Sequence, residues 1–132
     1  MELVEWANHF INNLNHFKRD LISKSTEGDE IKCVYKEKGE VIYIVCPDID
    51  EKVIERAKAG SCVIVCLNSK ENLEFAVKKW GALIKNRALK IVFANPALNL
   101  QWSLLPYTHE LISDRATLKE GLRSIAGSVP LV

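Results

Sequence analysis

Three short apolar runs, each rich in Val or Ile, end at polar turn residues. They are residues 43–46 before Pro47-Asp48, residues 62–67 before Asn68-Ser69, and residues 89–94 before Asn95-Pro96. Charged segments of helical length separate the runs. This alternation predicts strands of a mostly parallel sheet with covering helices, which is the pattern of an α/β domain.

The chain begins with a helical pattern over residues 2–24. Its apolar side chains recur at spacings of three and four, which places them on one stripe of a helix that packs on the sheet: Leu3, Trp6, Phe10, Leu14, Phe17 and Leu21. The polar, Gly-containing segment at residues 23–29 predicts a loop after this helix.

Residues 31–37 and 40–46 predict a β-hairpin around Lys38-Gly39, where Gly permits a positive φ. A two-residue loop would set Cys33 opposite Ile44. The second strand is apolar on both faces, so we expect it in the interior of the sheet. The first strand carries lysines on one face, which is typical of an edge strand.

Residues that can cap a helix precede three further amphipathic segments, which predict helices over residues 48–58, 72–86 and about 113–126. The predicted order of elements is αββαβαβα. We therefore expect a single domain over residues 1–132. Its architecture would be a three-layer α/β sandwich, with a mostly parallel sheet of about four strands and an antiparallel hairpin at the edge.

Composition is that of a soluble globular domain. The chain has 132 residues, of which 48% are hydrophobic and 27% charged, and its formal net charge is +1. This balance gives no overall attraction to nucleic acid or to an anionic membrane. No apolar run approaches the roughly 20 residues of a spanning helix, and the amino terminus lacks a basic leader. A cytoplasmic location and no membrane partner are expected.

The four cysteines fall within predicted strands, where reduced thiols act as small apolar side chains. Cys62 and Cys66 would lie about 13 Å apart along one strand, too far to share a metal ion. A disulfide between Cys33 and Cys46 is geometrically possible across the hairpin, although reduced thiols are the simpler interpretation. No metal site and no cofactor are predicted.

Polar residues at the strand ends form the first candidate site. Ligands of α/β sheets usually bind beyond the carboxyl ends of the strands, which would gather these side chains: Asp48, Asp50, Asn68, Ser69 and Asn95. Their carboxylates could bind Mg²⁺, and the amide and hydroxyl groups could orient a phosphate or carbonyl ligand. The alternative is structural, because helix caps and turns use the same residue types.

A second candidate site surrounds His109, which could act as a general base oriented by a carboxylate, with Tyr107 as an acid or stacking group. The group comprises Trp102, Tyr107, His109, Glu110 and Asp114. No nucleophile is identified, because no nearby Ser or Thr sits in a G-x-S-x-G elbow. The alternative is a Pro-broken loop whose aromatic side chains cover the end of the sheet.

The predicted element order over residues 2–95 resembles the restriction-endonuclease-like core. In that core a helix, a hairpin, a third strand, a helix and a fourth strand form the minimal unit. Such nucleases carry an acidic residue on the second strand and Glu-x-Lys on the third. Here the third predicted strand reads Ser61-Cys-Val-Ile-Val-Cys-Leu67, and Glu40 alone cannot supply the missing ligands. The resemblance therefore implies a domain without two-metal catalysis.

Few ionisable residues remain that caps and solvent do not explain, which favours a non-catalytic binding or assembly module over an enzyme. The partner would be a second copy of the chain or another protein. Aromatic and apolar residues form the predicted interface: Trp102, Leu105, Tyr107, Val129 and Leu131. The apolar tail at residues 129–132 could equally dock on its own domain.

Two other functions stay open. One is a small enzyme or ligand-binding protein that acts at the strand ends, with Asp48 as a ligand and His109 as a base. The other is a catalytically inactive, nuclease-like domain that binds nucleic acid through basic residues of its second half: Lys78, Lys79, Lys85, Arg87 and Lys90. A solvated helix face explains the same basic residues.

Overall fold

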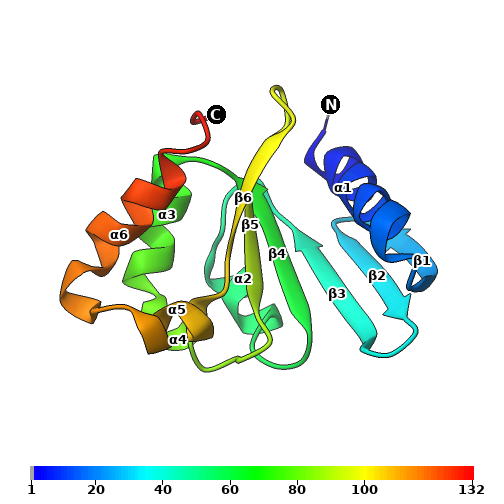
Figure 1. Cartoon of the computed structure of the whole chain (residues 1–132), viewed down its shortest axis with the longest axis horizontal. Helices are drawn as coiled ribbons and strands as arrows, with labels where there is room; N and C mark the ends of the chain where they lie inside the picture. The colour runs from blue at the N-terminus through cyan, green and yellow to red at the C-terminus, as the bar shows by residue number, and fades with distance from the viewer. Residues whose placement is uncertain (1) are drawn as a thin grey trace.

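The computed structural model describes residues 2–132 and contains a six-stranded mixed sheet (Figure 1). The strands lie in chain order across the sheet: β1 (Leu21–Glu27), β2 (Glu30–Tyr35), β3 (Gly39–Val45), β4 (Cys62–Leu67), β5 (Lys90–Asn95) and β6 (Leu100–Leu104). Strand β4 pairs in parallel with both β3 and β5, and the other pairings are antiparallel. The prediction of about four strands was wrong, and parallel pairing is confined to the centre of the sheet.

Helices cover both faces of this sheet, so the α/β class is confirmed. α1 (Leu3–Lys18) packs on one face (Figure 1). The other face belongs to the remaining helices: α2 (Glu51–Arg56), α3 (Lys70–Lys78), α4 (Trp80–Leu83), α5 (Pro106–Ile112) and α6 (Leu118–Ala126), with the 3-10 turn η1 (Arg115–Thr117) before α6. Within residues 2–132, no helix combines the length and the apolar composition needed to cross a membrane.

The sheet separates two apolar cores, because its central strands are apolar on both faces. Ile64, Ile91 and Phe93 face the side of helices α2 to α6, whereas Val65 faces α1. The indole of Trp102 stacks on Phe93, with ring centroids 4.3 Å apart. Full burial of an aliphatic or aromatic side chain contributes roughly 1.5–3 kcal/mol, so the two cores supply most of the stabilisation.

The first helix ends earlier than the sequence pattern predicts. Arg19 adopts a left-handed φ of 53°, and its backbone N–H donates to the carbonyl of Asn15. The side chain of Asn15 then accepts a hydrogen bond from the backbone N–H of Leu21, 3.0 Å away. The chain therefore turns into strand β1. The sequence had predicted that the helix continues to residue 24 and that residues 23–29 form a loop, so both predictions were wrong. The prediction failed because β1 is mostly exposed and lacks a clear apolar alternation.

The predicted hairpin exists, but its register was wrong. Cys33 pairs with Val41 and not with Ile44, because Lys36–Lys38 separate the two strands and Gly39 takes a φ of 72°. An odd shift in register moves one strand's side chains to the opposite face. Side chains of β2 such as Cys33 consequently share the α1 face with Val41. The first strand of this hairpin is not the edge either, because β1 pairs outside it.

The predicted helix over residues 72–86 is interrupted. α3 ends at Lys78, and α4 begins at Trp80 after Lys79 leaves helical geometry with a φ of −99° and a ψ of 16°. The interruption allows the helices to bury Leu73 and Trp80 in the same core. The irregular stretch predicted beyond Pro96 contains strand β6, paired with β5 at the sheet edge.

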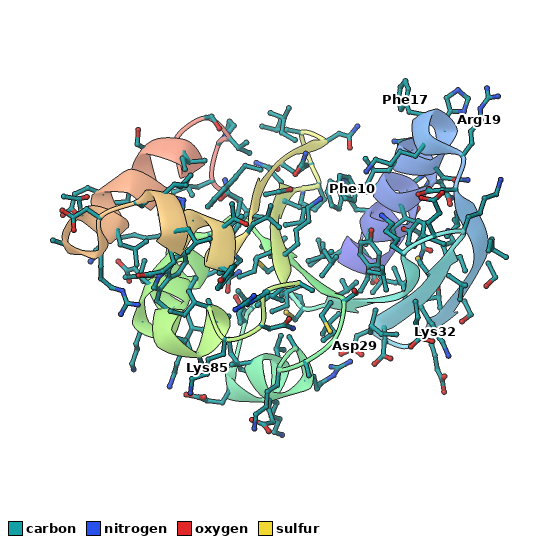
Figure 2. The ribbon with its side chains drawn as sticks, turned by 60° about the horizontal axis from the view of Figure 1, so that its bottom comes forward. Phe10, Phe17, Arg19, Asp29, Lys32 and Lys85 are labelled. Carbon is teal, nitrogen blue, oxygen red and sulfur yellow. The ribbon has the colours of Figure 1, made fainter. Side chains whose placement is uncertain are left out.

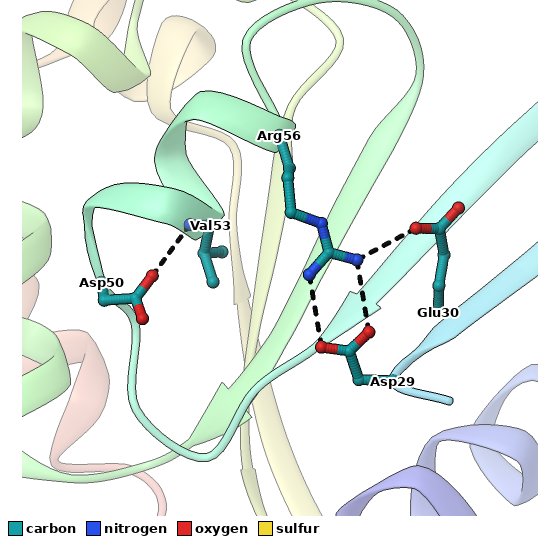
Figure 3. A network of polar contacts seen from close by, with 5 residues as sticks. All are labelled: Asp29, Glu30, Asp50, Val53 and Arg56. Carbon is teal, nitrogen blue, oxygen red and sulfur yellow. Dashed lines mark hydrogen bonds and ion pairs between the residues drawn. The ribbon is translucent and has the colours of Figure 1, made fainter. Parts of the chain in front are cut away.

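An ion-pair network fixes helix α2 to the hairpin of β1 and β2 (Figure 3). The guanidinium of Arg56 donates two hydrogen bonds to Asp29, at 3.2 and 3.3 Å, and one to Glu30, at 3.0 Å. These groups are largely exposed, so solvent weakens each pair. The bidentate geometry nevertheless fixes the orientation of α2 relative to the sheet.

The glycine of the β2–β3 turn is required by its backbone conformation. We predict that Gly39→Ala lowers the free energy of unfolding by about 1–2 kcal/mol, because an L side chain is strained at a φ of 72°. No atom lies within 4 Å of the added Cβ, so backbone strain is the whole cost. Urea denaturation measures the change.

Gly81→Ala is the matched control, because Gly81 lies in α4 and its added Cβ also meets no atom within 4 Å. Alanine is the better helix former, so this substitution should stabilise the protein by roughly 0.5–1 kcal/mol. Equal destabilisation by both substitutions would contradict the role assigned to Gly39.

Candidate functional site

The carboxyl ends of β4 and β5 are occupied by the chain's own tail. The Asn68 side-chain amide donates to the carbonyls of Val129 and Pro130, at 3.0 and 3.2 Å. Asn95 donates to the same Pro130 carbonyl at 3.0 Å. The backbone N–H of Val132 returns a hydrogen bond to the Asn68 carbonyl, also at 3.0 Å. The tail thus docks on its own domain and covers the edge where ligands of α/β sheets usually bind.

Asn68 also receives the indole of Trp102, whose Nε1–H donates to the Asn68 Oδ1 at 2.9 Å. Trp102 is therefore an internal group, with only 5% of its surface exposed, and Val129 is buried as well. Leu105 and Leu131 are exposed, but they lie at opposite ends of the strands. The predicted interface residues do not form one surface, because the structure buries two of them and separates the others.

Two of the remaining strand-end residues cap helices, and the third is exposed to solvent. Asp50 accepts a hydrogen bond from the Val53 N–H at 2.9 Å and begins α2 (Figure 3). Ser69 accepts from the Asn72 N–H at 3.1 Å and begins α3. Asp48 is exposed in a shallow hollow beside Asp50. The five predicted site residues therefore do not converge on a ligand position.

Asp50 and Asp48 offer a direct test of capping. Asp50→Ala should destabilise the protein by about 1 kcal/mol, because it removes the N-cap of α2. Asp48→Ala should change stability by less than about 0.5 kcal/mol, as is usual for an exposed residue. Urea denaturation of the two variants decides the matter, and a larger loss at Asp48 would contradict this assignment.

The buried Asn68 amide should be much more sensitive. Asn68→Ala leaves the Trp102 N–H and the tail carbonyls without their partner, so we predict a loss of about 2–3 kcal/mol in unfolding free energy. The control is Asn12→Ala, which removes only an exposed hydrogen bond to Lys24. A loss below about 1 kcal/mol for Asn68→Ala would contradict a central role for this amide.

The cluster around His109 holds two helices together. The Trp80 indole and the Arg115 guanidinium both donate to the carboxylate of Glu110. Arg115, followed by Trp80, lowers the pKa of this carboxyl. His109 contacts Ser113, with its Nε2 3.2 Å from the hydroxyl oxygen.

Glu110 is thereby committed to Trp80 and Arg115, and Asp114 caps η1. The aromatic members of this predicted site make other contacts. Trp102 packs in the core, and the guanidinium carbon of Arg87 lies over the ring of Tyr107, 4.9 Å from the ring centroid. The predicted general-base arrangement is not assembled.

The basic residues of the second half do not form one patch. Lys79 forms an ion pair with Glu51, and Arg87 lies over the ring of Tyr107. Lys85 is exposed on the side of the helices that cover the opposite face, away from α1 (Figure 2). Lys90 begins β5 and is partly buried in a pocket of the sheet.

Lys90 lies in a pocket of about 220 Å³ on the α1 face, at the amino ends of the parallel strands. The pocket is bounded by the end of α1, the turn after β2, and the first residues of β3, β4 and β5. Its polar and charged lining comprises Asn15, Lys18, Asp20, Tyr35, Lys38, Tyr43, Ser61 and Lys90, and its apolar lining includes Leu14, Val63 and Leu105.

The register of the sheet places the pocket's central residues in one row. Tyr43 on β3 pairs with Val63 on β4, and Val63 pairs with Lys90 on β5. The Tyr43 hydroxyl lies 3.4 Å from the hydroxyl of Tyr35, which reaches it from β2. A pair of phenolic hydroxyls and an amine therefore face the same space above an apolar floor.

The charges of this pocket favour an anion. Three lysines line it, Lys18, Lys38 and Lys90, against the single carboxylate of Asp20. Within residues 2–132, Lys90 makes no ion pair. The pKa of its amine is lowered, chiefly by burial and further by Lys18 and Lys38. A bound anion would relieve both effects.

The two phenols remain hydrogen-bond donors. Burial raises the pKa of Tyr35 and of Tyr43, so both hydroxyls stay protonated at neutral pH. A protonated phenol can donate to a carboxylate or phosphate oxygen. Among the described residues, no group of His, Cys, Asp and Glu side chains is arranged to hold a metal ion. The four cysteines are buried as free thiols.

The chain matches no protein-family model, no curated protein and no solved structure. The resemblance to the restriction-endonuclease-like core rests on element order alone. The structure does not confirm it, because β1 precedes the predicted hairpin and the element order differs from the predicted one. Neither β3 nor β4 contains a Glu-x-Lys sequence, and Glu40 on β3 forms an ion pair with Lys32.

Proposed function

We propose that this protein is a non-catalytic binding module for a small organic anion, held in the pocket at the amino ends of β3, β4 and β5. The observation that carries the proposal is Lys90, a partly buried lysine without an ion pair within residues 2–132 that lines a pocket with two tyrosines. Burying a cation without a counter-charge is costly. A bound anion supplies that counter-charge.

The lining also suggests the size and shape of the ligand. A volume of about 220 Å³ suits a molecule of a few carbon atoms that carries one carboxylate or phosphate group. The three lysines and the Tyr43 hydroxyl would hold the anionic group. Leu14, Val63 and Leu105 would contact the carbon skeleton.

The alternative to a small anion is nucleic acid. Three lysines at one pocket could also contact a phosphate backbone, which favours it. The pocket's small volume and its apolar floor favour the small anion, because a phosphate backbone tracks an open, charged groove.

Binding is tested by titrating the protein with lactate and with inorganic phosphate, followed by amide chemical shifts in NMR spectra. We predict shifts centred on the ends of β3, β4 and β5. Lys90→Met should weaken binding about tenfold or more, because a charge-assisted hydrogen bond contributes roughly 1.5–3 kcal/mol. Affinity should fall as the pH rises through the lowered pKa of Lys90, because the amine then loses its charge.

Lys85→Met is the matched control, since this exposed lysine lies away from the pocket and its loss should leave binding unchanged. Equal loss of affinity in both variants would indicate non-specific attraction. Tight, salt-sensitive binding of a short DNA duplex without response to either small anion would instead favour the nucleic-acid alternative.

A further inference from the structure

We infer that Lys90 captures small oxo acids covalently, by forming an imine between its ε-amine and the carbonyl carbon of the anion in the pocket. The inference rests on the proposed function, because the pocket must first hold the anion. It adds a chemical property that anion binding alone does not require. The ligand class becomes a carboxylic acid that carries a ketone or aldehyde group.

The surroundings of Lys90 favour an amine that acts as a nucleophile. Val63 pairs with Lys90 on one side, and on the other side the pairing of Ile91 with Leu104 brings Leu105 alongside. Val63 and Leu105 both line the pocket and are apolar. Lysines activated as nucleophiles are usually desolvated or lie beside another cation. Lys90 meets both conditions.

The charged and titratable groups of the pocket come from every element around it. Lys18 and Asp20 lie at the end of α1, Lys38 in the turn after β2, and the phenols on β2 and β3. Cys62 also borders the pocket, but its thiol belongs to the core on the other face of the sheet, and burial raises the pKa of that thiol. Burial, Lys18 and Lys38 lower the pKa of Lys90, so more of it is neutral at a given pH than of an exposed lysine.

Lys18 and Lys38 provide positive charge that can bind the carboxylate of the ligand. Both lysines line the same pocket as Lys90 and can hold the carboxylate. The carbonyl carbon next to that carboxylate would then lie toward Lys90. Holding two reacting groups together in this way raises the effective concentration of each.

The step is a condensation without oxidation or reduction. The lone pair of the Lys90 nitrogen attacks the carbonyl carbon, and the carbonyl π electrons move to oxygen, which takes a proton from the Tyr43 hydroxyl or from water. One of the two protons on the nitrogen returns to the group that protonated the oxygen, which gives the carbinolamine. The other nitrogen proton leaves together with the hydroxyl group as water, and the C=N bond forms. The reverse reaction with water releases the oxo acid, so the capture is reversible.

The experiment is reductive trapping with pyruvate and sodium cyanoborohydride, followed by mass spectrometry of the intact protein and of its peptides. We expect one adduct, located at Lys90, to form about tenfold or more faster than adducts at the exposed Lys85. Lys90→Arg, which keeps the charge but cannot form the imine, should remove this adduct. The trapping rate at Lys90 should rise with pH over a lower range than the rate at Lys85.

Lactate separates the inference from the proposed function, because it has the carboxylate of pyruvate but no carbonyl carbon at the ketone level. Lactate binding to the unmodified protein without a pyruvate adduct at Lys90 would overturn the imine and leave anion binding intact. Absence of both lactate binding and the adduct would overturn the proposed function itself. Adducts spread evenly over Lys90, Lys85 and other lysines would also overturn the imine, since ordinary surface amines react in that way.

Discussion

The architecture depends on one constraint: the central strands are apolar on both faces, and each face must be shielded from water. The side of α2 to α6 is covered by several helices, but α1 alone covers the other. A helix about 10 Å wide spans roughly two strand spacings of about 4.8 Å, so one helix cannot cover six strands. The end of α1 and the first residues of β3, β4 and β5 border the pocket. The pocket at Lys90 is the part of that face which a single helix leaves open.

The two ends of the parallel strands consequently have different roles. At the carboxyl ends, Asn68 and Asn95 bind the tail, and within residues 2–132 no buried side-chain nitrogen or oxygen lacks a hydrogen-bond partner. At the amino ends, Lys90 makes no ion pair within residues 2–132, and the pocket sets three lysines against the single carboxylate of Asp20. A satisfied polar network rigidifies a structure, whereas an excess of like charge in a pocket is more often associated with function. This contrast places the candidate site opposite the usual edge of an α/β sheet.

The sequence pattern predicted the elements whose signal is local and strong. Continuous apolar runs identified β3, β4 and β5, and capping residues indicated the helix α3, which begins at Lys70 and not at the predicted residue 72. Strand β1 was missed because its residues are largely exposed, so its stability comes from backbone pairing with β2 and not from a pattern of apolar positions. The predicted hairpin register was wrong because the sequence around Gly39 does not distinguish a three-residue turn from a two-residue turn.

The candidate site was harder to predict, because it depends on which side of a strand a residue occupies. Lys90 follows Leu89 at the start of an apolar run, and in the sequence it joins the nearby basic residues. Only the sheet register shows that it shares a row with Tyr43 on the α1 face. Asn68 had a similar ambiguity, since an asparagine before a helix resembles a cap until its distant partner Trp102 is known.

The tail that covers the carboxyl edge also sets an order of events during folding. Asn68 and Val129 are 61 positions apart, so their contact closes a long loop. Loop closure over such a distance costs entropy before the contact compensates for it. On a ribosome, the sheet's central strand emerges well before the segment that satisfies its end. Until residues 129–132 follow, the Asn68 amide and the Trp102 indole form an incomplete hydrogen-bond network, which residues 129 and 130 complete.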